Sequence, residues 1–198
     1  AATLTVTTDS AEKTYDGDPL TAVGAVTGYK NGETATFTVT GSQTEVGEST
    51  NTYTLVFDQT AASTDYTVSA TLGTLKVTED PTELTIESAT TSKEYDGTAL
   101  TAPTYTITYG DESGTATLDE ENGTYVYTLP TDDVITITPA ESATVTHVAD
   151  GTVKNAFSYT LENAEYYSNV TATEGDLRIT AATLTVTTDS AEKTYDGD

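Results

Sequence analysis

The chain has 198 residues with no cysteine and no methionine, which excludes a disulfide framework and metal sites built on thiolates. Aspartate and glutamate number 32 against 7 lysines and arginines, so the formal charge at pH 7 is −25. A surface of this charge repels nucleic-acid phosphates and anionic lipid, and no apolar run is long enough to cross a bilayer. We therefore expect no nucleic-acid partner and no membrane insertion.

An internal repeat organises the chain. Residues 181–198 are identical to residues 1–18, so the period is 181 − 1 = 180 residues. Within that stretch lies a Lys-x-Tyr-Asp-Gly motif that occurs three times, with tyrosines 95 − 15 = 80 and 195 − 95 = 100 residues apart. Each long period therefore contains two related units, as in proteins built from tandem modules. The motif residues are Lys13, Tyr15, Asp16, Gly17, Lys93, Tyr95, Asp96, Gly97, Lys193, Tyr195, Asp196 and Gly197.

These spacings predict a division of the chain. Unit one is expected over residues 1–80 and unit two over residues 81–180, with residues 181–198 forming the first strand and the Tyr-Asp-Gly turn of a truncated next repeat. The 100 − 80 = 20 extra residues of unit two are assigned to an additional hairpin near residues 109–129, where glycine turns gather. We expect the chain to be a window from a longer protein.

Threonine alternates with apolar residues through unit one, a period typical of strands with one buried face. No helical periodicity is sustained, and Gly, Asn-Gly, Asp-Gly and Pro interrupt the chain at short intervals. The alternation predicts strands at residues 2–8, 20–27, 34–41, 51–58, 65–71 and 73–79. The side chains expected to face inward are Leu4, Val6, Tyr15, Leu20, Phe37, Val39, Tyr53, Leu55, Phe57, Tyr66, Leu75 and Val77.

Unit two is predicted to begin after Pro81, which lacks an amide hydrogen and favours a break between strands. Leu84 and Ile86 then match Leu4 and Val6 of unit one. Short strands separated by frequent turns predict an all-β fold of tandem β-sandwich or Greek-key domains, and the short joints between consecutive units predict a rod.

The Lys-x-Tyr-Asp-Gly motif is interpreted as structural. Tyr15 and Tyr95 are expected to plug the cores of their units, while the Asp-Gly pair forms a turn in which glycine supplies a positive φ. The alternative is a buried amide bond from Lys13 or Lys93 to an asparagine or aspartate side chain.

The sequence offers little chemistry for catalysis. His147 is the only histidine and is predicted to be an ordinary strand residue, so neither a hydrolase triad nor a zinc site can be assembled. We expect no enzyme activity and no cofactor. Calcium is the alternative for the acidic clusters, at Asp16 and Asp18, Asp119-Glu120-Glu121, and Asp132-Asp133.

One pair of aromatic residues suggests a binding role. Tyr166 and Tyr167 are adjacent and predicted to face outward, so they are the possible ligand-binding residues, for instance as a face on which a sugar stacks.

The motifs together resemble the YDG/MBG-type tandem repeats of large bacterial surface proteins. Besides Lys-x-Tyr-Asp-Gly, the resemblance rests on Leu-Thr-Ala at residues 20–22 and 100–102, on residues 40–47, and on residues 73–78, and it covers both units and the third fragment. It implies an extracellular, Ig-like module strung in tandem, secreted or on the bacterial cell surface, with no catalytic residues.

The function expected from the resemblance is that of a structural stalk or spacer in a secreted or cell-wall-attached bacterial adhesin or surface fibre. Its partners would be neighbouring repeats of the same chain, and a host glycan or protein would be bound through a domain outside this segment. Two alternatives remain. Unit two could bind a glycan or protein through its additional hairpin, or residues 182–188, identical to residues 2–8, could add as a strand to a neighbouring chain and form a fibre.

Overall fold

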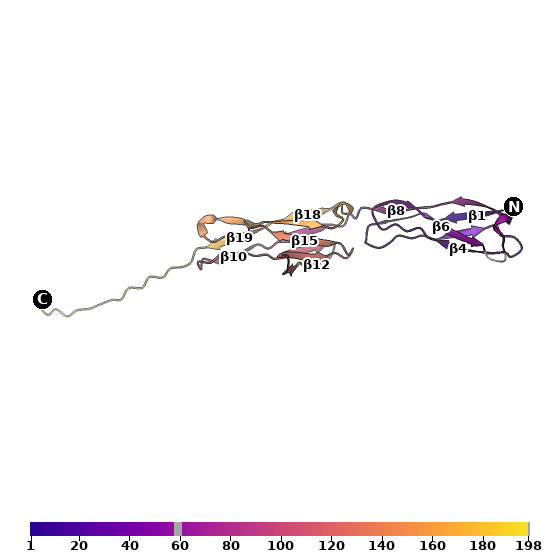
Figure 1. Cartoon of the computed structure of the whole chain (residues 1–198). Helices are drawn as coiled ribbons and strands as arrows, with labels where there is room; N and C mark the ends of the chain where they lie inside the picture. The colour runs from indigo at the N-terminus through magenta and orange to yellow at the C-terminus, as the bar shows by residue number, and fades with distance from the viewer. Residues whose placement is uncertain (58–60, 198) are drawn as a thin grey trace.

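The structure is a computed structural model that describes residues 1–57 and 61–197, and its regular elements are nearly all strands (Figure 1). Unit one contains β1 Ala2–Thr8, β2 Ala11–Thr14, β3 Gly24–Thr27, β4 Ala35–Val39, β5 Gly47–Thr50, β6 Tyr53–Phe57, β7 Tyr66–Thr71 and β8 Thr74–Thr78. Unit two contains β9 Leu84–Ser88, β10 Thr91–Glu94, β11 Tyr105–Tyr109, β12 Glu112–Thr115, β13 Thr117–Asp119, β14 Thr124–Thr128, β15 Val134–Pro139, β16 Thr152–Asn155, β17 Phe157–Leu161, β18 Val170–Thr173 and β19 Gly175–Thr180. Short 3-10 turns η1 Ser63–Asp65, η2 Val148–Asp150 and η3 Ala164–Tyr166 complete the described elements. The prediction of an all-β fold is confirmed.

The strands of unit one pair only with one another in the described residues. They form the sheets β3-β1-β7, β2-β8-β5 and β4-β6. The pairs β1 with β7 and β2 with β8 are parallel, and the other pairs are antiparallel. Strands from the start and the end of unit one therefore lie side by side and point the same way.

Unit two repeats this pairing scheme. Its sheets are β12-β11-β9-β18, β10-β19-β16 and β13-β14-β15-β17, and the parallel pairs are β9 with β18 and β10 with β19. The strands β12, β13 and β14 have no counterpart among the described strands of unit one, and they lie in the segment where the sequence predicts an additional hairpin. In Figure 1 the two groups of strands lie one after the other, joined by the segment between β8 and β9.

The predicted strand 2–8 is β1 with the expected bounds, and the other predicted strands of unit one are found with shorter ends. The expected strand 20–27 is β3 alone, and the last residue of the expected strand 51–58 lies outside the described residues. The alternation pattern missed β2 and β5, whose residues AEKT and GEST contain hardly any apolar side chains. Both strands flank β8, so tertiary pairing and not local propensity makes them strands.

The expected inward residues differ in how far they are buried. Six are buried, namely Leu4, Val6, Tyr15, Tyr66, Leu75 and Val77. Leu20, Phe37, Val39, Tyr53, Leu55 and Phe57 are only half-buried. Most of these six belong to β4 and β6, which form a two-stranded sheet and therefore have no neighbouring strand among the described residues to cover their edges.

A buried asparagine ties loops together at the same place in each unit. Asn51 is fully buried, and its Nδ2 donates to the Asp9 carbonyl at 2.9 Å. Asn155 has 1 % of its surface exposed, and its Nδ2 donates to the carbonyls of Ala89 and Ala102 at 2.9 and 2.8 Å. These hydrogen bonds satisfy loop carbonyls that lie outside the strands. No pattern in the sequence predicts this role.

Residues 181–197 form no strand, although residues 182–188 have the sequence of β1. The β1 strand is held between β3 and β7, and the described residues provide no such pair beside residues 182–188. Leu184 is 89 % exposed, whereas Leu4 is fully buried. The same sequence is thus a strand only where neighbouring strands flank it.

Candidate functional site: the joint between the two units

The Lys-x-Tyr-Asp-Gly motif of unit one is a closed turn. Lys13 Nζ forms an ion pair with Asp16 and donates to the Asp18 carbonyl at 2.5 Å. Asp16 Oδ1 accepts a hydrogen bond of 3.0 Å from the Asp18 amide, and Gly17 takes a φ of 82°. The hydrogen bond from Lys13 lowers the pKa of the Asp16 carboxyl. Because this lysine and its aspartate are partly exposed, they close a surface turn and are not set up for a buried amide bond.

The turn holds its tyrosine at the end of a strand pair. The Tyr15 amide donates to the Thr78 carbonyl at 2.8 Å, which extends the parallel ladder of β2 and β8 by one bond. The tyrosine ring therefore leaves unit one at the edge that faces unit two.

Tyr15 is buried with 6 % exposure, but much of what covers it belongs to unit two. Its ring makes edge-to-face contacts with Tyr166 and Tyr167, with centroid distances of 4.9 and 5.9 Å and interplanar angles of 61° and 86°. Its hydroxyl donates to Asp133 Oδ2 at 2.9 Å. Burial and the carboxylate together raise the pKa of Tyr15 to about 12. The expectation that Tyr15 plugs the core of its own unit is therefore wrong.

Asp133 is the acceptor around which the joint is built. Only 4 % of it is exposed, and its Oδ2 accepts from the Tyr167 hydroxyl at 2.5 Å as well as from Tyr15. Its Oδ1 accepts from Asn163 Nδ2 at 2.7 Å. A carboxylate removed from water needs such donors, because an unsatisfied buried charge is costly. Removing Tyr15 would take one of these donors from it.

The glycine of the turn is also part of the joint. A Cβ at Gly17 would lie 2.3 Å from the Thr131 carbonyl oxygen of unit two. The position thus requires glycine for two reasons, its positive φ and the close approach of the two backbones.

Apolar side chains close the rest of the joint. Val77 at the end of β8 belongs to the same buried cluster as Tyr15, Leu129 and Tyr167, and Val46 packs against it from the loop before β5. Burial of apolar area is the non-directional part of the attraction, while the Asp133 hydrogen bonds set the orientation.

The connecting segment is fastened to unit two. The Asp80 amide donates to the Tyr166 carbonyl at 2.8 Å, and the Ser168 amide donates to the Asp80 carbonyl at 3.0 Å. The Asp80 side chain is buried and accepts from both the amide and the hydroxyl of Thr82 and from the Tyr109 hydroxyl. Burial and this hydrogen bond raise the pKa of Tyr109 to about 12. A linker bonded at this many points does not act as a free hinge.

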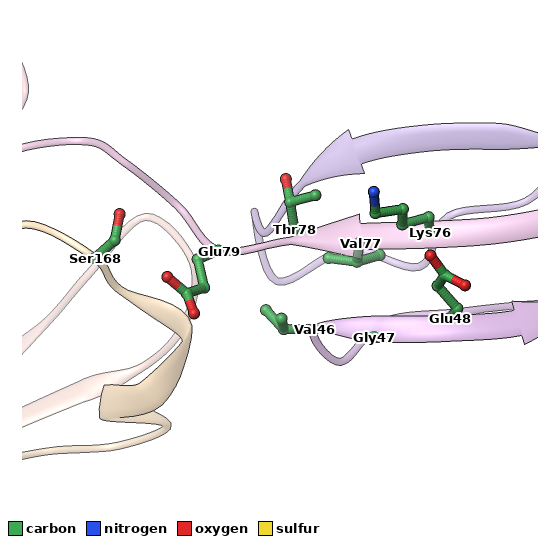
Figure 2. Close-up of a pocket in the computed structure, with 8 residues that line it drawn as sticks. All are labelled: Val46, Gly47, Glu48, Lys76, Val77, Thr78, Glu79 and Ser168. Carbon is green, nitrogen blue, oxygen red and sulfur yellow. The ribbon is translucent and has the colours of Figure 1, made fainter.

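A shallow hollow of about 500 Å³ opens beside the joint, and Figure 2 shows the side chains around it. It lies between the end of β8, the start of β5 and Ser168 of unit two. Lys76 on its wall pairs with Glu12 at 3.3 Å, and the Ser168 hydroxyl donates to the Asp80 carbonyl at 3.2 Å. Both of these polar groups are engaged in structural contacts, and we assign no reaction to the hollow.

The second motif has the same turn but a different environment. Lys93 Nζ lies 2.9 Å from Asp96 Oδ1, and Gly97 takes a φ of 81°. The hydrogen bond from Lys93 is the largest cause of a strongly lowered pKa at Asp96. Tyr95, however, is 41 % exposed and lies 6.0 Å from the His147 ring, so it does not plug a core as expected.

The third motif lies in the strandless segment. Lys193 Nζ lies 3.1 Å from Asp196 Oδ1, so the local ion pair forms without a folded unit around it. Tyr195 is 90 % exposed. The sequence of the motif therefore encodes the lysine–aspartate contact, and the neighbouring unit decides whether the tyrosine is buried.

Other candidate residues from the sequence have different roles from those expected. Tyr167 is buried in the joint, so the prediction that it faces outward is wrong, while Tyr166 is partly exposed beside Tyr15. His147 precedes η2 and is not in a strand. Within residues 1–57 and 61–197, no three histidine, aspartate or glutamate side chains come together as a metal site would require.

In comparisons with known proteins, no protein-family model, curated protein or solved structure matches this chain. In the described residues no helix is long and apolar enough to cross a membrane.

Sequence reasoning marked Tyr166 and Tyr167 only as an outward pair, and it missed the polar residues of unit two that receive Tyr15. The sequence pattern marks Asp133 only as half of an acidic pair for calcium, and it marks neither Thr131 nor Asn163. The equivalence of Asp133 and Glu33 becomes visible only in the strand register, where each stands two residues before a matching position, Ile135 or Ala35.

Proposed function

We propose that this chain is a stalk or spacer segment, in which β-sandwich units of an Ig-like, Greek-key kind are locked end to end as a rod. The observation that supports it best is the joint, where Tyr15 of one unit is buried against Asp133, Tyr166 and Tyr167 of the next. A spacer must hold a set length, and a joint fixed by hydrogen bonds resists bending as well as separation.

The pairing of the strands supports a load-bearing role. In β2 and β8 the pairing is parallel, with Ala11 opposite Leu75 and Thr14 opposite Thr78. Tension along the chain enters β2 from its start and leaves β8 from its end, so the two strands are pulled in opposite directions. Their hydrogen bonds are then loaded together in shear. The same holds for β10 and β19 in unit two.

The cellular setting is inferred from the resemblance and from the charge. A chain with a formal charge of −25 and no cysteine suits an extracellular, secreted or cell-wall-attached surface protein of a bacterium, with an adhesive domain elsewhere. Its partners within the segment are neighbouring repeats. A fibre formed by strand addition has less support, because β1, whose sequence residues 182–188 repeat, already pairs on both sides.

The test is mechanical. When the chain is pulled from its two ends in a single-molecule experiment, two unfolding events are expected, with contour lengths in the ratio of the two units. Extension at negligible force without discrete events would contradict the proposal. Small-angle scattering provides a second measurement, since a locked joint predicts one narrow distribution of maximum dimension that a Tyr15→Ala variant broadens.

A second candidate function has one observation in its favour. A hollow of about 340 Å³ lies between the β13–β14 hairpin and the body of unit two, with Tyr105, Leu118 and Tyr125 on its wall. The Tyr105 hydroxyl is buried with no hydrogen-bond partner in the described residues. Such an aromatic hollow favours binding of a glycan or an apolar peptide side chain. Loss of glycan-array or peptide binding on deletion of the hairpin would support it, and binding that persists would contradict it.

A further inference from the structure

The Tyr95 turn is the counterpart of the Tyr15 turn with its partner missing. Tyr95 is 41 % exposed against 6 % for Tyr15. A Cβ at Gly97 would meet no described atom within 4 Å, whereas one at Gly17 would lie 2.3 Å from unit two. The two turns share the lysine–aspartate contact and φ values of 82° and 81° at the glycines. The turn around Tyr95, at the end of unit two, therefore has the same local geometry as the Tyr15 turn but contacts no further unit among the described residues.

The apolar neighbour of the turn is exposed in the same way. The bridges Leu20 to Gln43 and Leu100 to Val145 correspond, and Val46 and Val148 each stand three residues after them, in a loop that is two residues longer in unit two. Val46 packs into the joint, while Val148 is 45 % exposed. Tyr95 and Val148 thus form an exposed apolar face similar to the face that Tyr15 and Val46 bury in the joint.

The N-terminal end of unit one has a tyrosine–carboxylate pair like the one that receives Tyr15 in unit two. The Tyr66 hydroxyl donates to Glu33 Oε2, just as the Tyr167 hydroxyl donates to Asp133. Each of these tyrosines directly follows a 3-10 turn. The hydrogen bond to Glu33 raises the pKa of Tyr66.

Strand register supports the equivalence of the two carboxylates. Ala35 lies opposite Phe57 in one unit and Ile135 lies opposite Leu161 in the other, and Glu33 and Asp133 stand two residues before Ala35 and Ile135. The pair Glu33 and Tyr66 lies near the N-terminus, because Ala2 pairs with Tyr66 in the β1–β7 ladder. The Tyr29 hydroxyl beside it is buried without a partner in the described residues.

We propose that the Tyr95 turn of one chain docks on the Glu33–Tyr66 end of a second copy, so that the joint inside the chain is repeated between chains. The Tyr95 hydroxyl would donate to Glu33, and Val148 would cover the apolar rim. The proposal rests on the proposed stalk function, whose joint it extends.

Two observations favour this partner over others. After unit two the chain continues with residues 181–198, which repeat residues 1–18, so the sequence itself places the start of a unit one after the Tyr95 turn. His147 stands beside Tyr95 at the position that Glu45 has in unit one, two residues after the bridge. The ring in contact with Tyr95 is therefore an imidazole, and not a carboxylate that would repel an approaching Glu33. Contacts of this head-to-tail kind do not close and produce linear assemblies.

The experiment is sedimentation of the intact chain over a range of concentrations, in added salt that screens the repulsion between copies. We expect association that grows with concentration. Gly97→Asn should weaken it at least about tenfold, because the new side chain occupies the contact surface while asparagine tolerates the positive φ. Tyr95→Ala and Glu33→Ala should weaken it similarly, each from its own side of the contact.

A matched control is available in the same unit. Gly123 has a φ of 68° and no described atom within 4 Å of a Cβ, so Gly123→Asn is the same change on a turn away from the contact. It should leave association unchanged. Mixing the Gly97→Asn chain with the Glu33→Ala chain should give dimers that grow no further, because each variant retains only one working end.

Several outcomes would overturn the proposal. They are a wild-type chain that stays monomeric throughout the range, equal association of the Gly97→Asn and Gly123→Asn variants, or a mixture that assembles beyond the dimer. If Tyr15→Ala loosens the internal joint while copies stay apart, the docking between copies fails and the stalk function survives. If the internal joint is also unaffected, both fail.

Discussion

The Tyr15 hydroxyl donates a hydrogen bond of 2.9 Å to Asp133 Oδ2, a residue 118 positions further along the chain. This bond joins a motif that looks local in the sequence to a second unit that the motif does not specify. The turn around Tyr15 is closed by its own lysine and aspartate, so the tyrosine points out of its own unit and is buried by the next. The recurring motif is therefore best understood as one half of a connector.

We expect Tyr15→Phe to weaken the coupling between the two units by about 1.5 kcal/mol, because a hydrogen bond to a charged acceptor is lost while the ring contacts remain. Urea unfolding of the variant and of Asp133→Asn, combined in a double-mutant cycle, measures the coupling. Tyr95→Phe is the control, since no described residue bonds that hydroxyl, and its effect should stay within about 0.5 kcal/mol. Equal effects of the two substitutions would mean that the bond to Asp133 contributes nothing.

Alanine at the two turn glycines should have unequal effects. At Gly97 the cost is the positive φ alone, about 1 kcal/mol. At Gly17 the same strain is joined by a Cβ that would lie 2.3 Å from the Thr131 carbonyl, so the backbones must separate. We therefore expect Gly17→Ala to cost more than Gly97→Ala in denaturant unfolding and to raise hydrogen exchange at the joint. Similar costs and unchanged exchange would contradict the close approach of the units.

Much of the fold could be predicted from the sequence, because alternation encodes which face of a strand is buried. Leu4 and Val6 are fully buried as expected, and the strands around them lie where the pattern placed them. The pattern failed where burial depends on a partner from elsewhere. β2 and β5 contain few apolar residues and are strands because β8 lies between them.

The candidate site shows the same limit more clearly. Residues 181–198 repeat residues 1–18 in full, yet Tyr195 is 90 % exposed and Tyr15 is 6 % exposed. No local property of the sequence can separate these two tyrosines. The difference lies in the unit beyond the motif, so contacts between units decide the role of the motif.

The buried asparagines should be more sensitive than their polarity suggests. Asn155→Leu would leave the carbonyls of Ala89 and Ala102 unpaired in a buried setting, and we expect a loss of about 3 kcal/mol in the free energy of unfolding. Asn122→Ala is the control, because Asn122 is exposed and its amide bonds the nearby Asp119. Thermal and urea unfolding of both variants measure the difference. A leucine variant as stable as the wild type would show that these two carbonyls find other partners.

The joint should weaken in alkali. The pKa of Tyr15 is raised from 10.0 to about 12 in the folded chain, so folding favours the protonated hydroxyl. A group of this kind contributes stability that is complete below the unfolded pKa and is lost as pH rises through the folded one. The stability difference between the wild type and Tyr15→Phe should therefore be constant up to about pH 10 and shrink towards pH 12. Urea unfolding at a series of pH values measures this stability difference.

Tyr109→Phe is the control, because it removes another hydroxyl with a pKa of about 12. In the Tyr109→Phe background, the stability difference between chains with and without Tyr15→Phe should keep the same pH dependence. A difference that stayed constant through pH 12 would contradict a raised pKa of the Tyr15 hydroxyl in the joint.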